Sequence, residues 1–338
     1  MKESEPTAEG PVDRPVGLPS DDLERAILGD PPMFNAMQVA SETGVTVDQA
    51  RRLWRALGFP ETGNAVAFTQ ADLEATSTLV GAIDHGLFDF DVAVTLTRAV
   101  GQTMARLADW EVTTLVHRVQ DLEKGEQATG SLVGSAMRLV DEFSAPFEEL
   151  LVYAWRRHLA AAVARLQALS ANEEDLHTTQ LTVGFADIVS FTALSNELAE
   201  ERIGDLVELF ESRCHDVVSA QHGRVIKSIG DSVLFVNDDP IRAYDSAEGI
   251  INVIGRDPRM PDVRVGLASG SVVMRLGDVF GPPVNMAARL TAVARRNRVI
   301  VDAATADLLP DDQFETRRLP ARPVRGFGLV EPVAVRRA

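Results

Sequence analysis

Two patterns of hydrophobic and polar positions divide the chain. Residues 21–167 contain long stretches rich in Ala, Leu, Val and Glu, with few β-branched alternations. Such stretches are typical of helices. Breaks at residues 58–60, 63–64, 86 and 130–131, each of which contains glycine, predict about six or seven helices. This half of the chain is therefore expected to be all-α.

The last helix of this half has a regular apolar spacing. Its apolar positions are Phe147, Leu151, Trp155, Leu159, Ala162, Leu166 and Leu169. From Trp155 onward the steps of four and three residues are those of a coiled-coil seam over two heptads. An amphipathic helix packed on its own domain has the same spacing, but we favour a helix that relays a signal to the second half. The polar stretch 170–180 is expected to be a linker.

After residue 180 the pattern changes to strands that alternate with helices. The strand-like runs are 181–188, 224–228, 232–236, 263–268, 271–275 and 298–301. Helical stretches are expected at 196–220, 240–255 and 284–294. This order, with a hairpin after the first helix, predicts an α+β domain with a ferredoxin-like core.

The composition fits two folded domains. The chain has 338 residues, 45% of them hydrophobic, which is enough for two cores. Residues 1–17, rich in Glu, Pro and Gly, are expected to form a flexible tail. The sequence has no signal-peptide pattern and no apolar run of about eighteen residues, so we expect no transmembrane segment. The single cysteine, Cys214, fits a reducing, cytoplasmic location.

The charge distribution argues against nucleic acid as a partner. Residues 1–176 contain 14 Lys and Arg against 28 Asp and Glu (net −14), and residues 177–338 contain 19 against 22 (net −3), which gives the total of −17. An acidic domain repels a phosphate backbone.

Residues 38–54 nevertheless have the outline of a helix-turn-helix, and nearby basic residues available to phosphates are Arg51, Arg52 and Arg55. A DNA-binding regulator is therefore the alternative interpretation.

Two carboxylates occupy positions where strands end. Asp187 follows the buried-looking run that begins at residue 181, and Asp231 lies in a tight turn in which Gly230 permits the bend. Neighbouring strands would bring both carboxylates to one rim of the sheet. Hard oxygen ligands of this kind suit Mg²⁺ or Mn²⁺ bound together with a triphosphate. Taken singly, each residue also fits a turn-forming Asp without a ligand.

A third segment, residues 278–289, contains three polar groups: the carboxylate of Asp278, the amide of Asn285 and the guanidinium of Arg289. Pro282 and Pro283 signal the start of a helix. Asn285 and Arg289 are four residues apart and share one face of that helix, so both side chains can enter one cleft. Individually they also fit a helix-start Asn and a surface Arg.

Together these three segments resemble the catalytic domain of a class III nucleotidyl cyclase. The resemblance extends from about residue 178 to the end of the sequence. It implies a ferredoxin-like catalytic fold and a head-to-tail homodimer with two shared active sites. The implied reaction is attack of the ribose 3′-oxygen of ATP on the α-phosphorus, which gives cyclic AMP and pyrophosphate. Two Mg²⁺ or Mn²⁺ ions per site would assist the reaction.

The resemblance assigns the metal ions and the phosphates to the first two segments. The metal-binding residues would be Asp187, Ile188 and Asp231. The loop that leads into the following helix would hold the β- and γ-phosphates, with contacts from Phe191 and Thr192. This chain has Ser190 where the family usually has Gly, which adds a Cβ at a close backbone approach.

Base, ribose and transition-state roles follow from the same resemblance. Lys227 and Asp278 are the combination that accompanies adenine, because Lys donates to N1 and Asp accepts from the N6 amine. Asn285 would orient the ribose, and Arg289 would neutralise charge at the α-phosphorus. Arg325 resembles a basic phosphate contact of the family, although a solvent-facing Arg fits equally.

The first half is similar to the helical regulatory domain that precedes some actinobacterial class III cyclase domains, in residues 34–58 and 68–72. This resemblance implies a sensor that responds to protons or to a hydrophobic small molecule. The residues able to titrate near neutrality are His85, His117 and His158, although a surface or capping position is the better explanation of each. The expected organisation is a tail (1–17), a regulatory domain with a relay helix (18–169), a linker (170–180) and a catalytic domain (181–338). In the alternative, a DNA-binding protein carries a weak or guanylate-using cyclase domain.

Overall fold

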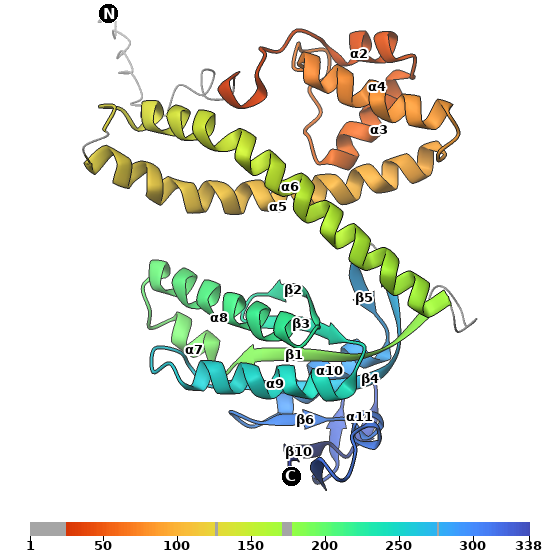
Figure 1. The fold of residues 1–338 in the computed structure, drawn as a ribbon, viewed down its shortest axis with the longest axis vertical. Coiled ribbons are helices and arrows are strands. Elements are labelled where there is room, and N and C mark those ends of the chain that lie inside the picture. Colours follow the sequence, from red (N-terminus) through yellow and green to blue (C-terminus); the bar gives the residue numbers. More distant parts are fainter. Residues whose placement is uncertain (1–24, 126–127, 171–177, 276) are drawn as a thin grey trace, which may run out of the picture. The chain divides into compact units, whose positions relative to one another are not determined.

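The computed structural model describes residues 25–125, 128–170, 178–275 and 277–338. The chain divides into two compact units, residues 1–160 and 161–338. In the described residues the first unit is helical and the second is built on a β-sheet (Figure 1). The predicted tail and most of the predicted linker lie outside the described residues. None of the helices described combines the length and the apolar character needed to cross a lipid bilayer.

The described part of the first unit contains five long or medium helices. They are α2 (Ala36–Thr43), α3 (Val47–Leu57), α4 (Gln70–Asp84), α5 (Phe90–Lys124) and α6 (Leu132–Ser170). Capping boxes begin the first three, and Gly44 and Gly58 end α2 and α3 in the left-handed conformation. The predicted glycine breaks therefore lie between helices, while α5 and α6 run for 35 and 39 residues.

A ferredoxin-like core forms the centre of the second unit. Its strands are β1 (Thr178–Ile188), β2 (Arg224–Ile229), β3 (Ser232–Asn237) and β4 (Val263–Arg275), and its two crossing helices are α8 (Glu200–Ala220) and α9 (Pro240–Gly255). The strands pair antiparallel in the order β2-β3-β1-β4. The α+β prediction is thus confirmed.

Further elements extend this core. Strands β6 (Val299–Val301), β10 (Val333–Arg337) and β7 (Phe314–Arg318) continue the sheet beyond β4, and β5 (Asp278–Phe280) pairs with β4. A separate ribbon consists of β8 (Arg322–Val324) and β9 (Gly328–Val330). The remaining helices are α7 (Phe191–Ser195), α10 (Pro282–Val293) and α11 (Ala303–Leu308).

Two predicted boundaries were wrong. Runs 263–268 and 271–275 form the single strand β4, because β1 pairs with it continuously from Ile188↔Val263 to Thr178↔Val273 and keeps Gly270 extended. The helix expected at 196–220 begins four residues later than predicted, as α8 at Glu200, and the short helix α7 (Phe191–Ser195) that precedes it was not predicted.

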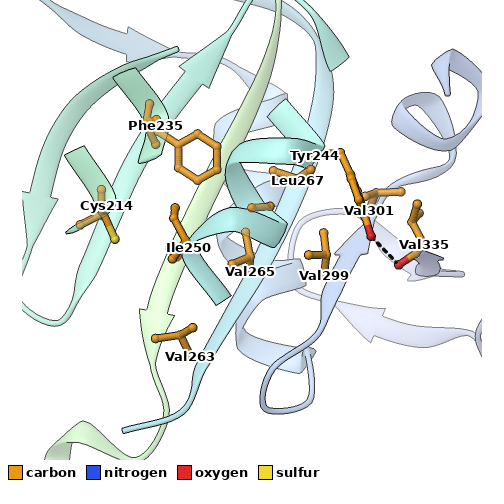
Figure 2. Close-up of a cluster of buried hydrophobic side chains, with 14 of the residues drawn as sticks. Cys214, Phe235, Tyr244, Ile250, Val263, Val265, Leu267, Val299, Val301 and Val335 are labelled. Atoms are coloured by element: carbon orange, nitrogen blue, oxygen red, sulfur yellow. Dashed lines mark hydrogen bonds between the residues drawn. The ribbon is translucent and has the colours of Figure 1, made fainter. Parts of the chain in front are cut away.

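The two faces of the sheet are covered by different helices. On one face α8 and α9 enclose a cluster that includes Cys214, Phe235, Tyr244, Ile250 and Leu267 (Figure 2). Tyr244 donates its hydroxyl to the Val335 carbonyl at 3.3 Å, and Cys214 is fully buried. The other face packs against α10 through Leu181, Val183, Leu234, Ala268 and Ala287. Helix α10 and the residues it carries therefore belong to the face opposite α8 and α9.

Candidate active site

Asp187 and Asp231 lie at the same end of the sheet. Asp187 is the penultimate residue of β1, opposite Ser232 of β3 and Arg264 of β4. Asp231 occupies the two-residue turn between β2 and β3, where Gly230 has a φ of +62°. The backbone N–H of Ile188 donates to the Asp231 carbonyl at 3.1 Å, which joins the two carboxylate-bearing segments.

These two carboxylates fit a divalent cation. Burial raises the pKa of the Asp231 carboxyl, and the charge of Asp187 raises it further, against the opposing effects of the Asp231 backbone N–H and Arg264. A cation would relieve the repulsion between the two anions. Within the described residues there is no cluster of three or more His, Cys, Asp or Glu side chains. A cation here would therefore depend on backbone, water or phosphate oxygens for its remaining ligands.

Two further residues hold Asp187, and the sequence analysis did not identify them. The Ser232 hydroxyl donates to Asp187 Oδ1 at 2.5 Å, and Arg264 donates from Nε to Oδ2 at 2.8 Å and forms an ion pair with it, with Nη2 at 2.7 Å from Oδ2. Arg264 also donates from Nη1 to the Ala292 carbonyl of α10 at 3.1 Å. The available signal was a charged residue early in an otherwise buried strand, but that signal does not identify its partner.

The loop after β1 turns sharply at Ser190. Ser190 has φ 60° and ψ 29°, a left-handed conformation that costs a residue with a Cβ about 1–2 kcal/mol. This backbone conformation explains a preference for Gly at the position. The Val189 N–H donates to the Asp262 carbonyl at 2.8 Å, and α7 begins directly afterwards with half-buried Phe191 and exposed Thr192.

Lys227 and Asp278 form an ion pair. Lys227 Nζ donates to Asp278 Oδ2, and the two side chains are 36% and 27% exposed. Ile226 is the extra residue of a β-bulge between β2 and β3, directly before Lys227. Burial raises the pKa of Asp278, but the hydrogen bond from Lys227, the Val279 N–H and the charge of Lys227 outweigh it and lower the pKa overall. The lowered pKa favours the charged form of the Asp278 carboxylate beside Lys227.

Asn285 and Arg289 are exposed on α10, and neither makes a hydrogen bond or ion pair with another described residue. The Arg264 contact sets the Asp187 end of the sheet beside Ala292, at the last turn of α10. Asn285 lies seven residues earlier, roughly 10 Å along the helix axis. The structure thus joins Asp187 with Asp231 and Lys227 with Asp278, but gives Asn285 and Arg289 no partner in the described part of this chain.

Arg325 is exposed in the turn between β8 and β9, outside the main sheet, and no hydrogen bond or ion pair among the described residues links it to the carboxylates. Its predicted phosphate contact stays a prediction.

Two of the three arginines of the predicted helix-turn-helix form ion pairs with acidic side chains of the first unit. Arg52 donates to Asp91 at 2.9 Å and lies over the Phe90 ring at 5.0 Å. Arg55 pairs with Glu61 at 3.5 Å. These contacts compete with phosphate binding. The three histidines proposed to titrate, His85, His117 and His158, are all exposed.

Comparisons with known proteins agree on one family. Residues 174–335 match the family described as the adenylate and guanylate cyclase catalytic domain. An adenylate cyclase of Streptomyces coelicolor is 37% identical over 358 residues, which cover 98% of this chain and 92% of the relative. An adenylate cyclase of Glutamicibacter nicotianae is 37% identical over 96% of this chain and 85% of its own length. A pH-sensitive adenylate cyclase of Mycobacterium tuberculosis is 29% identical over 93% and 81%, respectively.

Proposed function

Because the chain belongs to the adenylate and guanylate cyclase family, we propose that it is an adenylate cyclase that converts ATP to 3′,5′-cyclic AMP and pyrophosphate. The observation that carries the choice of base is the assembled Lys227–Asp278 pair. An ammonium has three donors and a carboxylate has about four acceptor positions, so each retains capacity for adenine N1 and N6. Guanine presents a donor at N1 and an acceptor at O6, and each mismatched buried group would cost about 1–3 kcal/mol.

Metal ions and phosphates would be held by the end of β1 and the turn after β2. Asp187, Asp231 and Ile188 would bind two Mg²⁺ or Mn²⁺ ions, and the backbone N–H groups of the loop at 188–192 would hold the β- and γ-phosphates. When bound, the ions supply charge neutralisation and lower the pKa of the ribose 3′-hydroxyl. Asn285 orients the ribose, and Arg289 balances the charge that develops on the α-phosphoryl oxygens.

The active site would be shared between two subunits. Asn285 and Arg289 are exposed and lack partners in the described part of this chain, and Asn285 lies roughly 10 Å along α10 from the Asp187 end. A head-to-tail homodimer would bring the α10 residues of one subunit to the carboxylates of the other, and two-fold symmetry then creates two complete sites.

The helical unit would regulate this activity. The boundary between the two compact units falls inside α6, so one helix contains residues of both. This continuity supports the predicted relay role of α6, with a proton or a hydrophobic small molecule as the signal.

Deleting residues 1–175 should change the rate of cyclic AMP formation, or its dependence on pH or lipid, much more than the stability of the remaining domain. Equal activity of the shortened and full-length chains under every such condition would contradict the relay.

The direct test measures cyclic AMP formation by the full chain, with ATP or GTP and with Mg²⁺ or Mn²⁺. We expect turnover of ATP in preference to GTP, dependence on the divalent ion, and no turnover by a folded Asp231→Ala variant. Near-normal activity of that variant would contradict the metal assignment, and preferential use of GTP would contradict the base assignment.

A further inference from the structure

The Asp187 carboxylate is held unequally at its two oxygens. Oδ2 accepts a hydrogen bond from Arg264 Nε at 2.8 Å and lies 2.7 Å from Nη2 of the same guanidinium as an ion pair, and Oδ1 accepts one hydroxyl, that of Ser232, at 2.5 Å. An ionised carboxylate has about four acceptor positions, two on each oxygen. The Arg264 guanidinium lies against Oδ2 with two nitrogens, whereas Oδ1, which Ser232 contacts, keeps an acceptor position away from that cation.

Ser232 restrains the second oxygen of this carboxylate. The terminal torsion of an Asp side chain is broad and roughly two-fold, so the hydrogen bond at Oδ1 narrows the range of torsions that the Arg264 contacts to Oδ2 alone permit. Ser232 is the direct cross-strand partner of Asp187, and the sheet register therefore determines where its hydroxyl lies. Only 14% of the Asp187 side chain is exposed, which limits the water available to replace that hydroxyl.

The position of Ser232 in the chain links it to the second carboxylate. It follows Asp231 directly and begins β3, so the same hairpin turn carries one candidate ligand and the group that orients the other. A shift of this turn would move Asp231 and the Ser232 hydroxyl together.

We propose that Ser232 is a positioning residue that orients the Asp187 carboxylate, so that the remaining acceptor position on Oδ1 is offered to a divalent cation together with Asp231. The proposal rests on the metal-binding role of Asp187 in the proposed function. Loss of a hydrogen bond that orients a metal ligand typically weakens metal binding about 10- to 100-fold. Ser232 itself contacts neither the cation nor the nucleotide in this proposal.

The experiment titrates Mn²⁺ into the full-length protein and follows free Mn²⁺ by electron paramagnetic resonance, with and without 3′-deoxyATP, which lacks the attacking hydroxyl. The variants are Ser232→Ala, Ser232→Thr, Ser232→Cys and Asp187→Ala. Ser228→Ala is the matched control, because Ser228 is a half-buried serine of the same hairpin and donates no hydrogen bond to Asp187 in the part of the chain that the structure describes. Thermal unfolding in EDTA reports whether each variant folds.

We expect Ser232→Ala to weaken Mn²⁺ binding about 10- to 100-fold and to raise the Mn²⁺ concentration for half-maximal activity. Ser232→Thr retains the hydroxyl and should bind close to the wild-type affinity, as should Ser228→Ala. Ser232→Cys retains the volume with a weaker donor and should fall between; it replaces Ser232→Ala if that variant does not fold.

Wild-type Mn²⁺ affinity in folded Ser232→Ala, combined with lost binding in Asp187→Ala, would overturn the positioning role and leave the proposed function intact. Wild-type affinity in Asp187→Ala as well would overturn the metal assignment itself, and the positioning role with it. Equal losses in Ser232→Thr and Ser232→Ala would also overturn the proposal, because the hydroxyl would then be irrelevant.

Discussion

Gly266 is the position at which α10 approaches the sheet most tightly among the contacts described for β4. A Cβ added at Gly266 would lie 2.4 Å from the Thr291 backbone N and 2.6 Å from the Ala287 carbonyl oxygen. Both are backbone atoms of α10, so no side chain can rotate to make room. Gly266→Ala should therefore displace the helix that carries Asn285 and Arg289.

The size of the displacement follows from these distances. Ordinary contacts of a Cβ lie between 3.4 and 4 Å, so α10 must move by about 1 Å. Overpacking of this kind costs about 1–3 kcal/mol, which is less than the stability of a typical domain, about 5–15 kcal/mol. A misplacement of about 1 Å in a catalytic group can lower the rate about 100-fold. The variant should thus remain folded and lose most of its turnover.

The assay compares kcat at saturating Mn²⁺ and ATP with the free energy of unfolding from urea denaturation. Gly204→Ala in α8 is the control, since no heavy atom lies within 4 Å of its added Cβ and its backbone is helical. That change should leave kcat unaltered and stabilise the protein by about 0.5–1 kcal/mol.

Wild-type kcat in Gly266→Ala would refute the inference that α10 must move to accept a Cβ, or that its position matters for turnover. If activity is lost only in proportion to the unfolded fraction, displacement of α10 does not lower turnover in the folded protein, and overpacking acts through stability alone.

Three further predictions follow from the site. Asp187→Ala and Asn285→Ala chains should each be inactive, but an equal mixture with free subunit exchange should recover about a quarter of wild-type activity, since half the dimers are mixed and each has one intact site; no recovery despite demonstrated exchange would place each site within one chain. Lys227→Glu combined with Asp278→Cys should weaken use of ATP and favour GTP, and an unchanged ATP-to-GTP ratio of kcat/KM would show that the pair does not read the base. Because the pKa of Asp231 is raised in the fold, the folded state binds more protons than the unfolded state, and stability falls as pH rises from the unfolded pKa through the folded one. Asp231→Asn should therefore raise the melting temperature in EDTA at pH 7 while abolishing the stabilisation by Mn²⁺; a lower melting temperature in EDTA would contradict this sign.

The local sequence determined most of the elements and where on them the candidate residues lie. Gly230 and Asp231 fit only a tight turn between two short strands, and Pro282 and Pro283 begin α10 at its first two positions. Fixed spacing along the chain therefore predicted which carboxylates end strands and which polar residues share a helix face. These rules act over a few residues, so no tertiary information was needed to apply them.

Only the tertiary structure decided which groups are partners. Arg264 reaches Asp187 across 77 residues of sequence, and Ser232 reaches it across 45, because strand pairing sets the register between β1, β3 and β4. The same pairing keeps β4 continuous through Gly270, where a local rule predicts a break. Long-range register depends on which faces are buried and on every neighbouring strand at once, and no spacing along the chain encodes it.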